Sequence, residues 1–177
     1  MKINPSILEK KLNIKFSDQK IFIKSLTHKS FDSKNNNEKI EFLGDRVLGL
    51  IIAKKLLEIY PKEKEGILDK KFASLVNKKT CSSIARKLNL KKFMYVGTSH
   101  KNLERSADKM ISDCLEAIVG AIYLDGGLRA AQKFILYFWQ SYLEKSIITL
   151  IDSKTLLQEY SLKKFKELPK YNFYKKV

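Results

Sequence analysis

Apolar and polar positions follow a helical period along nearly the whole chain. An Asn-Pro pair at 4–5 opens a first short helix that reaches about residue 12. Ser17 or Asp18 caps a second helix, which carries the apolar residues of 21–26. The pattern then predicts helices at 38–59, 66–88, 107–124 and 128–150, with a polar loop at 33–37, an irregular stretch at 91–102 and a stop at 125–127. This order of elements indicates an all-α fold.

A domain boundary is expected near residue 151. It divides the chain into a first domain at 1–150 and a second segment at 151–177. The second segment is expected to contain a helix over 155–165, a break at Pro169 and the beginning of a strand at Tyr171. Because a lone helix and strand cannot bury a core, we expect this segment to be an appendage or the front of a truncated domain.

The charge balance points to a polyanionic partner. The 177 residues include 35 Lys and Arg against 19 Asp and Glu, a net charge of +16. Such an excess suits nucleic acid or an acidic membrane surface, although a lysine bias of the genome is the plain alternative. Only four of the 35 are Arg. Since Lys acts as a point charge and Arg as a planar fork, this ratio favours contact with phosphates over reading of bases.

Several function classes lose support from the sequence. Cys81 and Cys114 form no metal-binding motif, so we expect buried, reduced thiols in a cytoplasmic protein. We expect neither a signal peptide nor a membrane partner, since no apolar run approaches the ~18 residues of a membrane span. No glycine-rich phosphate loop supports a small-molecule cofactor. His28 is interpreted as a packed, hydrogen-bonded residue, and His100 as solvated in a loop.

Five carboxylates lie in two otherwise apolar helices. Glu38, Glu41 and Asp45 share one helix face, because positions i, i+3 and i+7 fall within roughly 60° of one another. Asp113 and Glu116 are the only charged residues in the stretch MISDCLEAIVGAIYL. A helix that is apolar on most sides is typically buried, so these charges need an explanation.

Three explanations remain open from the pattern alone. The first is a solvated face with ion pairs along the helix. Lys39 and Arg46 could serve the first helix and Lys109 could pair with Asp113, but no basic residue lies three or four positions from Glu116. The second is a set of buried salt bridges, each of which costs several kcal/mol of desolvation. The third is a hard divalent cation such as Mg²⁺, which takes carboxylate oxygens. An acidic metal pocket in a basic protein suits phosphodiester hydrolysis.

Five stretches, taken in order and spacing, resemble the ribonuclease III family of double-stranded-RNA endonucleases. They are NEKIEFLGDRVLG from residue 37, LTHKSF from residue 26, Glu65-Gly66 ahead of ASLV, Gly97, and SDCLEAIVGAIYLDGG from residue 112. The resemblance covers nearly all of residues 1–150. The segment DSKTLLQEY from residue 152 resembles the first helix of the α-β-β-β-α double-stranded-RNA-binding domain of bacterial members.

The resemblance implies an all-α nuclease domain that works as a cytoplasmic homodimer on double-stranded RNA. It implies cleavage with Mg²⁺, for which Mn²⁺ substitutes, and products with 5′-phosphates, 3′-hydroxyls and two-nucleotide 3′ overhangs. It also implies a role in the processing of ribosomal and messenger RNA. The rival interpretation is a protein of the same fold that binds double-stranded RNA without cleaving it. Such relatives typically lack one or more of the acids.

The resemblance also implies roles for individual residues. The acids that match the metal and catalytic cluster are Glu41, Asp45, Asp113 and Glu116, with Asp45 and Glu116 flanking the scissile phosphate. Other matches are Glu38 and Glu65 in the RNA-processing centre, Phe42 in the dimer interface, and Thr155, Gln158 and Glu159 on the RNA minor groove. We expect water activated by the metal to attack in line, so that no protein nucleophile is needed. Arg46, Leu162 and the Lys71-Phe72 pair depart from the family's usual residues.

Overall fold

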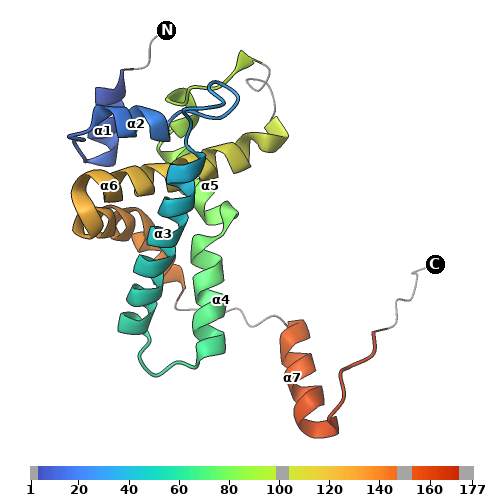
Figure 1. The fold of residues 1–177 in the computed structure, drawn as a ribbon. Coiled ribbons are helices and arrows are strands. Elements are labelled where there is room, and N and C mark those ends of the chain that lie inside the picture. Colours follow the sequence, from blue (N-terminus) through green and yellow to red (C-terminus); the bar gives the residue numbers. More distant parts are fainter. Residues whose placement is uncertain (1–3, 99–103, 147–152, 172–177) are drawn as a thin grey trace. The chain divides into compact units, whose positions relative to one another are not determined.

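The computed structural model describes residues 4–98, 104–146 and 153–171, without the side chains of 104–106 and 153–156. The chain divides into two compact units, Met1–Ile147 and Ile148–Val177. The first contains α1 (Pro5–Leu12), α2 (Gln19–Ser25), α3 (Glu38–Ile59), α4 (Glu65–Val76), α5 (Lys78–Lys87), the 3-10 turn η1 (Leu90–Lys92) and α6 (Glu104–Lys145) (Figure 1). The second contains α7 (Ser153–Phe165). Among these residues an isolated bridge joins Thr27 and Tyr95 and no sheet forms, so the all-α class is confirmed.

The first two helices begin where the sequence places their caps. The Asn4 side chain accepts a hydrogen bond from the Ser6 amide, and Pro5 occupies the first turn of α1. Asp18, rather than Ser17, caps α2, because its carboxylate accepts from the amides of Lys20 at 2.8 Å and Ile21 at 3.2 Å. The N-termini of both helices therefore follow from local side-chain chemistry.

The single helix expected at 66–88 is wrong. α4 ends at Val76, and α5 begins at Lys78. Asn77 between them is extended, with φ −73° and ψ 161°, and its Oδ1 accepts the Thr80 amide hydrogen at 2.9 Å. An asparagine side chain that satisfies an amide of the next turn starts a new helix, and the apolar face shifts by about half a turn across it.

The stop expected at 125–127 is a kink within one long helix. Gly127 has φ 74° and ψ −175°, and the helical backbone resumes directly after it. The left-handed φ explains the glycine, since side chains disfavour this region. α6 thus runs from Glu104 to Lys145, whereas the expected extension to 150 lies outside the described residues beyond 146.

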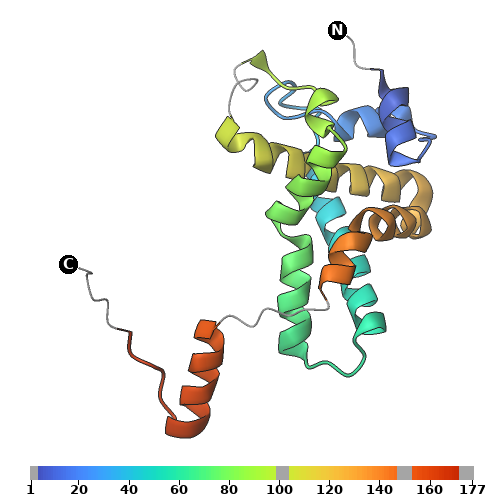
Figure 2. The ribbon, with the colours of Figure 1, turned by 180° about the vertical axis from the view of Figure 1, so that it is seen from behind.

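The core of the first unit lies where α3 packs along α6. α3 and α4 run antiparallel to each other, and in the reverse view α5 continues from the end of α4 (Figure 2), where it packs on α6. Trp139 of α6 is fully buried, and its Nε1 donates to the Leu75 carbonyl at 2.9 Å. Phe22 of α2 is also fully buried and stacks on Phe16. Each such side chain contributes about 1.5–3 kcal/mol through burial.

The second unit exposes much of its apolar surface. Leu157, Tyr160 and Leu162 of α7 and Phe165 at its end are 45–60% exposed. The helix therefore buries little of its apolar surface within this unit. Of the strand expected from Tyr171, only Tyr171 is described, and the remainder lies outside the described residues. The assignment of residues 1–150 to a nuclease domain and of 151–177 to the start of an RNA-binding domain stays a prediction. None of the described helices has both the length and the apolar character to cross a bilayer.

Candidate metal centre

The centre is assembled where α3 and α6 cross in backbone contact. A Cβ atom added to Gly44 of α3 would lie 1.7 Å from the carbonyl oxygen of Glu116. A Cβ added to Gly120 of α6 would lie 2.3 Å from the carbonyl oxygen of Ile40. Glycine is needed at both positions because any larger residue would push the helices apart. The crossing brings the first turns of α3 against the turn of α6 that carries Asp113 and Glu116.

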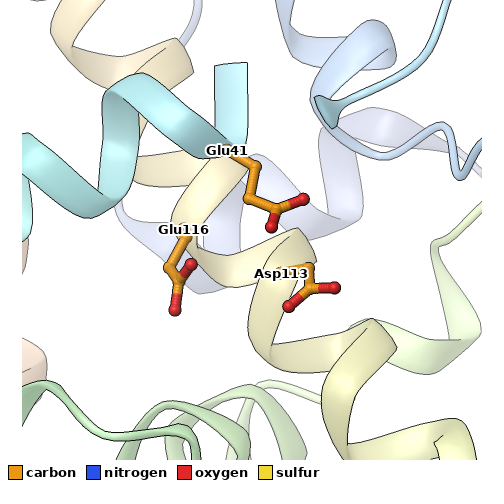
Figure 3. A group of neighbouring side chains, drawn as sticks. All are labelled: Glu41, Asp113 and Glu116. Carbon is orange, nitrogen blue, oxygen red and sulfur yellow. The ribbon is translucent and has the colours of Figure 1, made fainter. Parts of the chain in front are cut away.

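Three carboxylates converge at this crossing. Glu41 points from α3 toward Asp113 and Glu116 on α6 (Figure 3). One carboxylate oxygen from each residue lies within 4.8 Å of those of the other two, and all three side chains are half-buried. Asp45 lines the same cleft but does not belong to this group of three, and its Oδ2 pairs with the guanidinium of Arg46. The structure thus brings together three of the four acids expected in the cluster and places the fourth beside them.

Burial and neighbouring acids raise the pKa values of two of the three carboxylates. Burial first, and then the charges of Asp45, Asp113 and Glu41, together raise the pKa of Glu116 to about 7. Burial and the Asp113 charge also raise the pKa of Glu41. Such shifts mean that the metal-free cluster favours protons, and that a cation in the cluster would relieve both the burial and the repulsion.

A lysine occupies part of the cluster in the metal-free chain. Lys109 Nζ lies 2.8 Å from Asp113 Oδ2 and lines the cleft. This ion pair and the charges of Glu41 and Glu116 raise the pKa of Lys109. The helical pair considered from the sequence therefore forms. It neutralises one acid only, which leaves Glu41 and Glu116 without an equivalent ion pair among the described residues.

The cleft around the cluster has a volume of about 570 Å³. Glu38 lies at its edge, and its carboxylate binds Lys29 Nζ at 2.8 Å, which lowers the pKa of Glu38. Phe42 also lines the cleft, with 65% of its surface exposed. His28 is hydrogen-bonded to Ser30, in agreement with the structural interpretation, yet it too lines the cleft.

The remaining predicted residues lie elsewhere. Glu65 begins α4, beyond the loop that follows the far end of α3, and it does not line the cleft. Gln158 and Glu159 lie in α7 of the second unit. The side chain of Thr155 and the whole of His100 lie outside the described residues. Both cysteines are buried and free, and burial raises their pKa values, so the expectation of buried, reduced thiols is confirmed.

Three functional positions were missed from the sequence. Gly44 and Gly120 permit the helix crossing, and Asn37 lines the cleft beside Glu41. Small residues inside apolar helices were a usable signal for a close crossing, but nothing in the pattern paired these two. Asn37 precedes α3 and begins the stretch that resembles the family signature, but it was assigned no role from the sequence.

The donor set fits a hard divalent cation. Three carboxylates offer the oxygen ligands that Mg²⁺ and Mn²⁺ prefer, and the group contains no thiolate or imidazole that would select a softer metal. Mg²⁺ binds oxygens at about 2.0–2.1 Å, so ligands on opposite sides of it are about 4 Å apart. A group within 4.8 Å therefore closes on the ion through small side-chain rotations.

Comparisons with known proteins agree on one family. A family model described as Ribonuclease-III-like matches residues 18–143. A protein named Ribonuclease 3 from Pelagibacter ubique is 67% identical over 171 residues, which cover 97% of this chain and 77% of that protein. Ribonuclease 3 from Bartonella henselae is 43% identical over 157 residues, which cover 87% and 67%.

Solved structures show the same likeness. The nuclease domain of ribonuclease III from Campylobacter jejuni superposes with a TM-score of 0.76 at 39% identity, covering 80% of this chain and 99% of that one. Dicer from Pichia stipitis superposes with a TM-score of 0.60 at 21% identity, covering 91% and 75%. The latter likeness concerns the fold alone.

Proposed function

The chain belongs to the ribonuclease III family, and on this premise we propose that it is an endonuclease that uses a divalent cation to hydrolyse double-stranded RNA. The observation that carries the proposal is the group Glu41, Asp113 and Glu116, held at a helix crossing in a chain of net charge +16. The positive field gathers the polyanion, and the acidic cleft holds the cation that the reaction requires.

Glu41, Asp113 and Glu116 would bind the cation, which we take to be Mg²⁺ with Mn²⁺ as a substitute. When bound, such a cation activates water and stabilises the departing 3′ oxygen. Asp45 and Glu116 flank the scissile phosphate, one from each helix of the crossing. For Asp45 to face the phosphate, its carboxylate leaves Arg46, whose side chain is 65% exposed and has space to turn outward.

A homodimer would complete the site. Phe42, Leu50 and Leu57 are 59–65% exposed and fall within roughly 80° of one another on α3, so they form one apolar stripe. Two copies related by a two-fold axis match the antiparallel strands of a duplex, and two offset cuts leave 3′ overhangs of two nucleotides. Glu65, which lies away from the cleft of its own protomer, would reach the RNA-processing centre with Glu38 only from the second copy. The Campylobacter jejuni nuclease domain itself has a region involved in dimer formation.

The second unit would contribute RNA affinity. We assign residues 151–177 to the beginning of a double-stranded-RNA-binding domain, with Thr155, Gln158 and Glu159 on the minor groove. The family relationship supports a place in the cytoplasm and a role in the processing of ribosomal and messenger RNA.

The proposal is tested with a cleavage gel. Long double-stranded RNA is incubated with this chain at low salt with Mg²⁺, in parallel with EDTA and with the Glu116→Gln variant. Glu63→Gln is the matched control, because Glu63 is exposed in the loop before α4 and does not line the cleft. We expect short duplex products from the wild type and Glu63→Gln alone. Equal cleavage by Glu116→Gln, or binding of RNA by a folded wild type that never cleaves it, would contradict the proposal.

A further inference from the structure

One edge of the cleft is built from uncharged side chains. His28 and Asn37 line it together with the acids. Backbone hydrogen bonds fix both residues: the His28 amide donates to the Tyr95 carbonyl at 3.0 Å, and the Asn37 amide donates to the Thr27 carbonyl at 2.9 Å. The Tyr95 amide in turn donates to the carbonyl of Leu26 at 3.0 Å. The segment that carries His28 is therefore held between Tyr95 on one side and Asn37 on the other, which makes this edge rigid.

The contacts of Ser30 set the tautomer of His28. The Ser30 amide donates to His28 Nδ1 at 3.1 Å, and Ser30 Oγ lies 2.8 Å from the same nitrogen. Ser30 Oγ itself accepts from the Gly97 amide at 3.0 Å, so its hydroxyl hydrogen is directed to Nδ1. Since Nδ1 accepts, the neutral ring carries its hydrogen on Nε2. The ring nitrogen that Ser30 does not contact is thus a hydrogen-bond donor, and His28 lines the cleft.

Asn37 offers a second donor. The residue is 2% exposed, and its Nδ2 is buried without a hydrogen-bond partner in the part of the chain that the structure describes. Asn37 is also the N-cap residue of α3 without making a side-chain cap bond. A buried donor without an acceptor is costly and calls for a specific explanation. Because the terminal torsion of asparagine is broad, a rotation of the amide turns Nδ2 toward the cleft that the residue lines.

The charged side chains of the cleft are poorly placed to bind the phosphates of RNA, so neutral donors would be useful there. Its two lysines are already engaged, Lys29 with Glu38 and Lys109 with Asp113. The acids repel an approaching phosphate, and an additional cation at the edge would compete with the metal for them. Neutral donors attract phosphate oxygens without that competition.

We propose that His28 Nε2 and Asn37 Nδ2 donate hydrogen bonds to phosphate oxygens of the RNA strand next to the scissile bond. The inference rests on the proposed function and adds two substrate-positioning residues to it. The acceptor missing from Asn37 in the free chain is then supplied by the substrate.

The test compares two asparagine caps. Asn37→Ala removes a side chain without a partner, so we expect an unchanged or higher melting temperature together with a fall of about ten-fold in kcat/KM for double-stranded RNA. Asn77→Ala is the matched control. Its Oδ1 accepts the Thr80 amide hydrogen and it does not line the cleft, so it should lower the melting temperature and leave kcat/KM unchanged. Mg²⁺ affinity, measured by calorimetry, should match the wild type in both variants.

His28 is tested by loss and rescue. His28→Ala should lower kcat/KM by about ten-fold, and His28→Gln, which restores an amide donor, should recover most of it. With an RNA duplex that carries a single 2′-deoxynucleotide at the scissile position, the effect of both alanine variants should persist, because the acceptors are phosphates. An effect that vanishes on this duplex would overturn the assignment to phosphate.

The inference is also overturned if Asn37→Ala and His28→Ala cleave with wild-type kcat/KM, or if their activity falls only in step with melting temperature or Mg²⁺ affinity. A wild type that binds RNA without cleaving it would refute the proposed function instead. In that case the two alanine variants should still bind RNA more weakly than the wild type. RNA affinity equal to that of the wild type would refute the proposed contacts of His28 and Asn37 with phosphate as well.

Discussion

Replacing Gly120 with alanine tests whether the helix crossing holds the acids in place. The new Cβ would lie 2.3 Å from the carbonyl oxygen of Ile40, whereas ordinary contact begins near 3.4 Å. α3 and α6 must therefore separate locally by about 1 Å. Ile40 immediately precedes Glu41, so this separation moves Glu41 away from Asp113 and Glu116.

The expected effect is larger on activity than on stability. Overpacking costs about 1–3 kcal/mol, and the better helix propensity of alanine offsets up to about 1 kcal/mol of this. A displacement of about 1 Å at reacting groups lowers rates by about 10²-fold. We therefore expect Gly120→Ala to fold with a modestly lower free energy of unfolding, to bind Mg²⁺ more weakly and to lose about 99% of kcat.

Gly49→Ala provides the matched control. Gly49 lies in α3 like Gly44, but its added Cβ would meet only the Phe72 ring at 3.4 Å, an ordinary contact. Urea unfolding, Mg²⁺ calorimetry and single-turnover cleavage are measured on both variants. Wild-type kcat and Mg²⁺ affinity in a folded Gly120→Ala protein would refute the view that backbone contact at the crossing sets the geometry of the cluster.

Four further predictions concern Asp125, Glu116 and Lys109. Asp125→Asn should lower the free energy of unfolding by about 1–2 kcal/mol in urea, because the Asp125 carboxylate accepts the amide hydrogens of Ser17 and Asp18; unchanged stability would contradict this, and cleavage should not change. Below the Glu116 pKa of about 7, Mg²⁺ binding must displace its proton, so calorimetry should show proton release and an affinity that falls up to about ten-fold per pH unit; a flat profile would contradict this. Because the folded pKa is raised, the metal-free chain should also lose stability as pH rises from about 4.5 to 7. Lys109→Met should increase Mg²⁺ affinity at low salt, because it removes the ammonium group that pairs with Asp113; weaker binding would show that Lys109 supports the metal.

Local chemistry made much of the fold predictable. The bounds of α1 and α3, the Asp18 cap and the break at Gly127 each depend on residues close together in the sequence. The division between α4 and α5 was missed, although the apolar positions shift by about half a turn across Asn77. At about 100° per residue, Cys81 and Ile84 fall opposite Phe72 and Leu75. A single side-chain cap decided that boundary.

The candidate acids were also accessible to sequence reasoning. Glu116 stood out because no basic residue lies one helical turn away in an apolar helix, and the structure places it beside Asp113 and Glu41. Arg46 was considered as a cation for the acids of this helix one turn away, but not for Asp45 beside it, because neighbouring residues on a helix do not share a face. The contact between Gly44 and Gly120 joins residues far apart in sequence, so only the packed structure reveals it.

The most direct test of the central claim is anomalous diffraction from crystals of this chain soaked in Mn²⁺. The account predicts a peak between the carboxylates of Glu41, Asp113 and Glu116, with Lys109 turned away from Asp113, and no peak there in Glu116→Gln crystals. A Mn²⁺ peak elsewhere in the molecule, with these three carboxylates left unliganded, would contradict it.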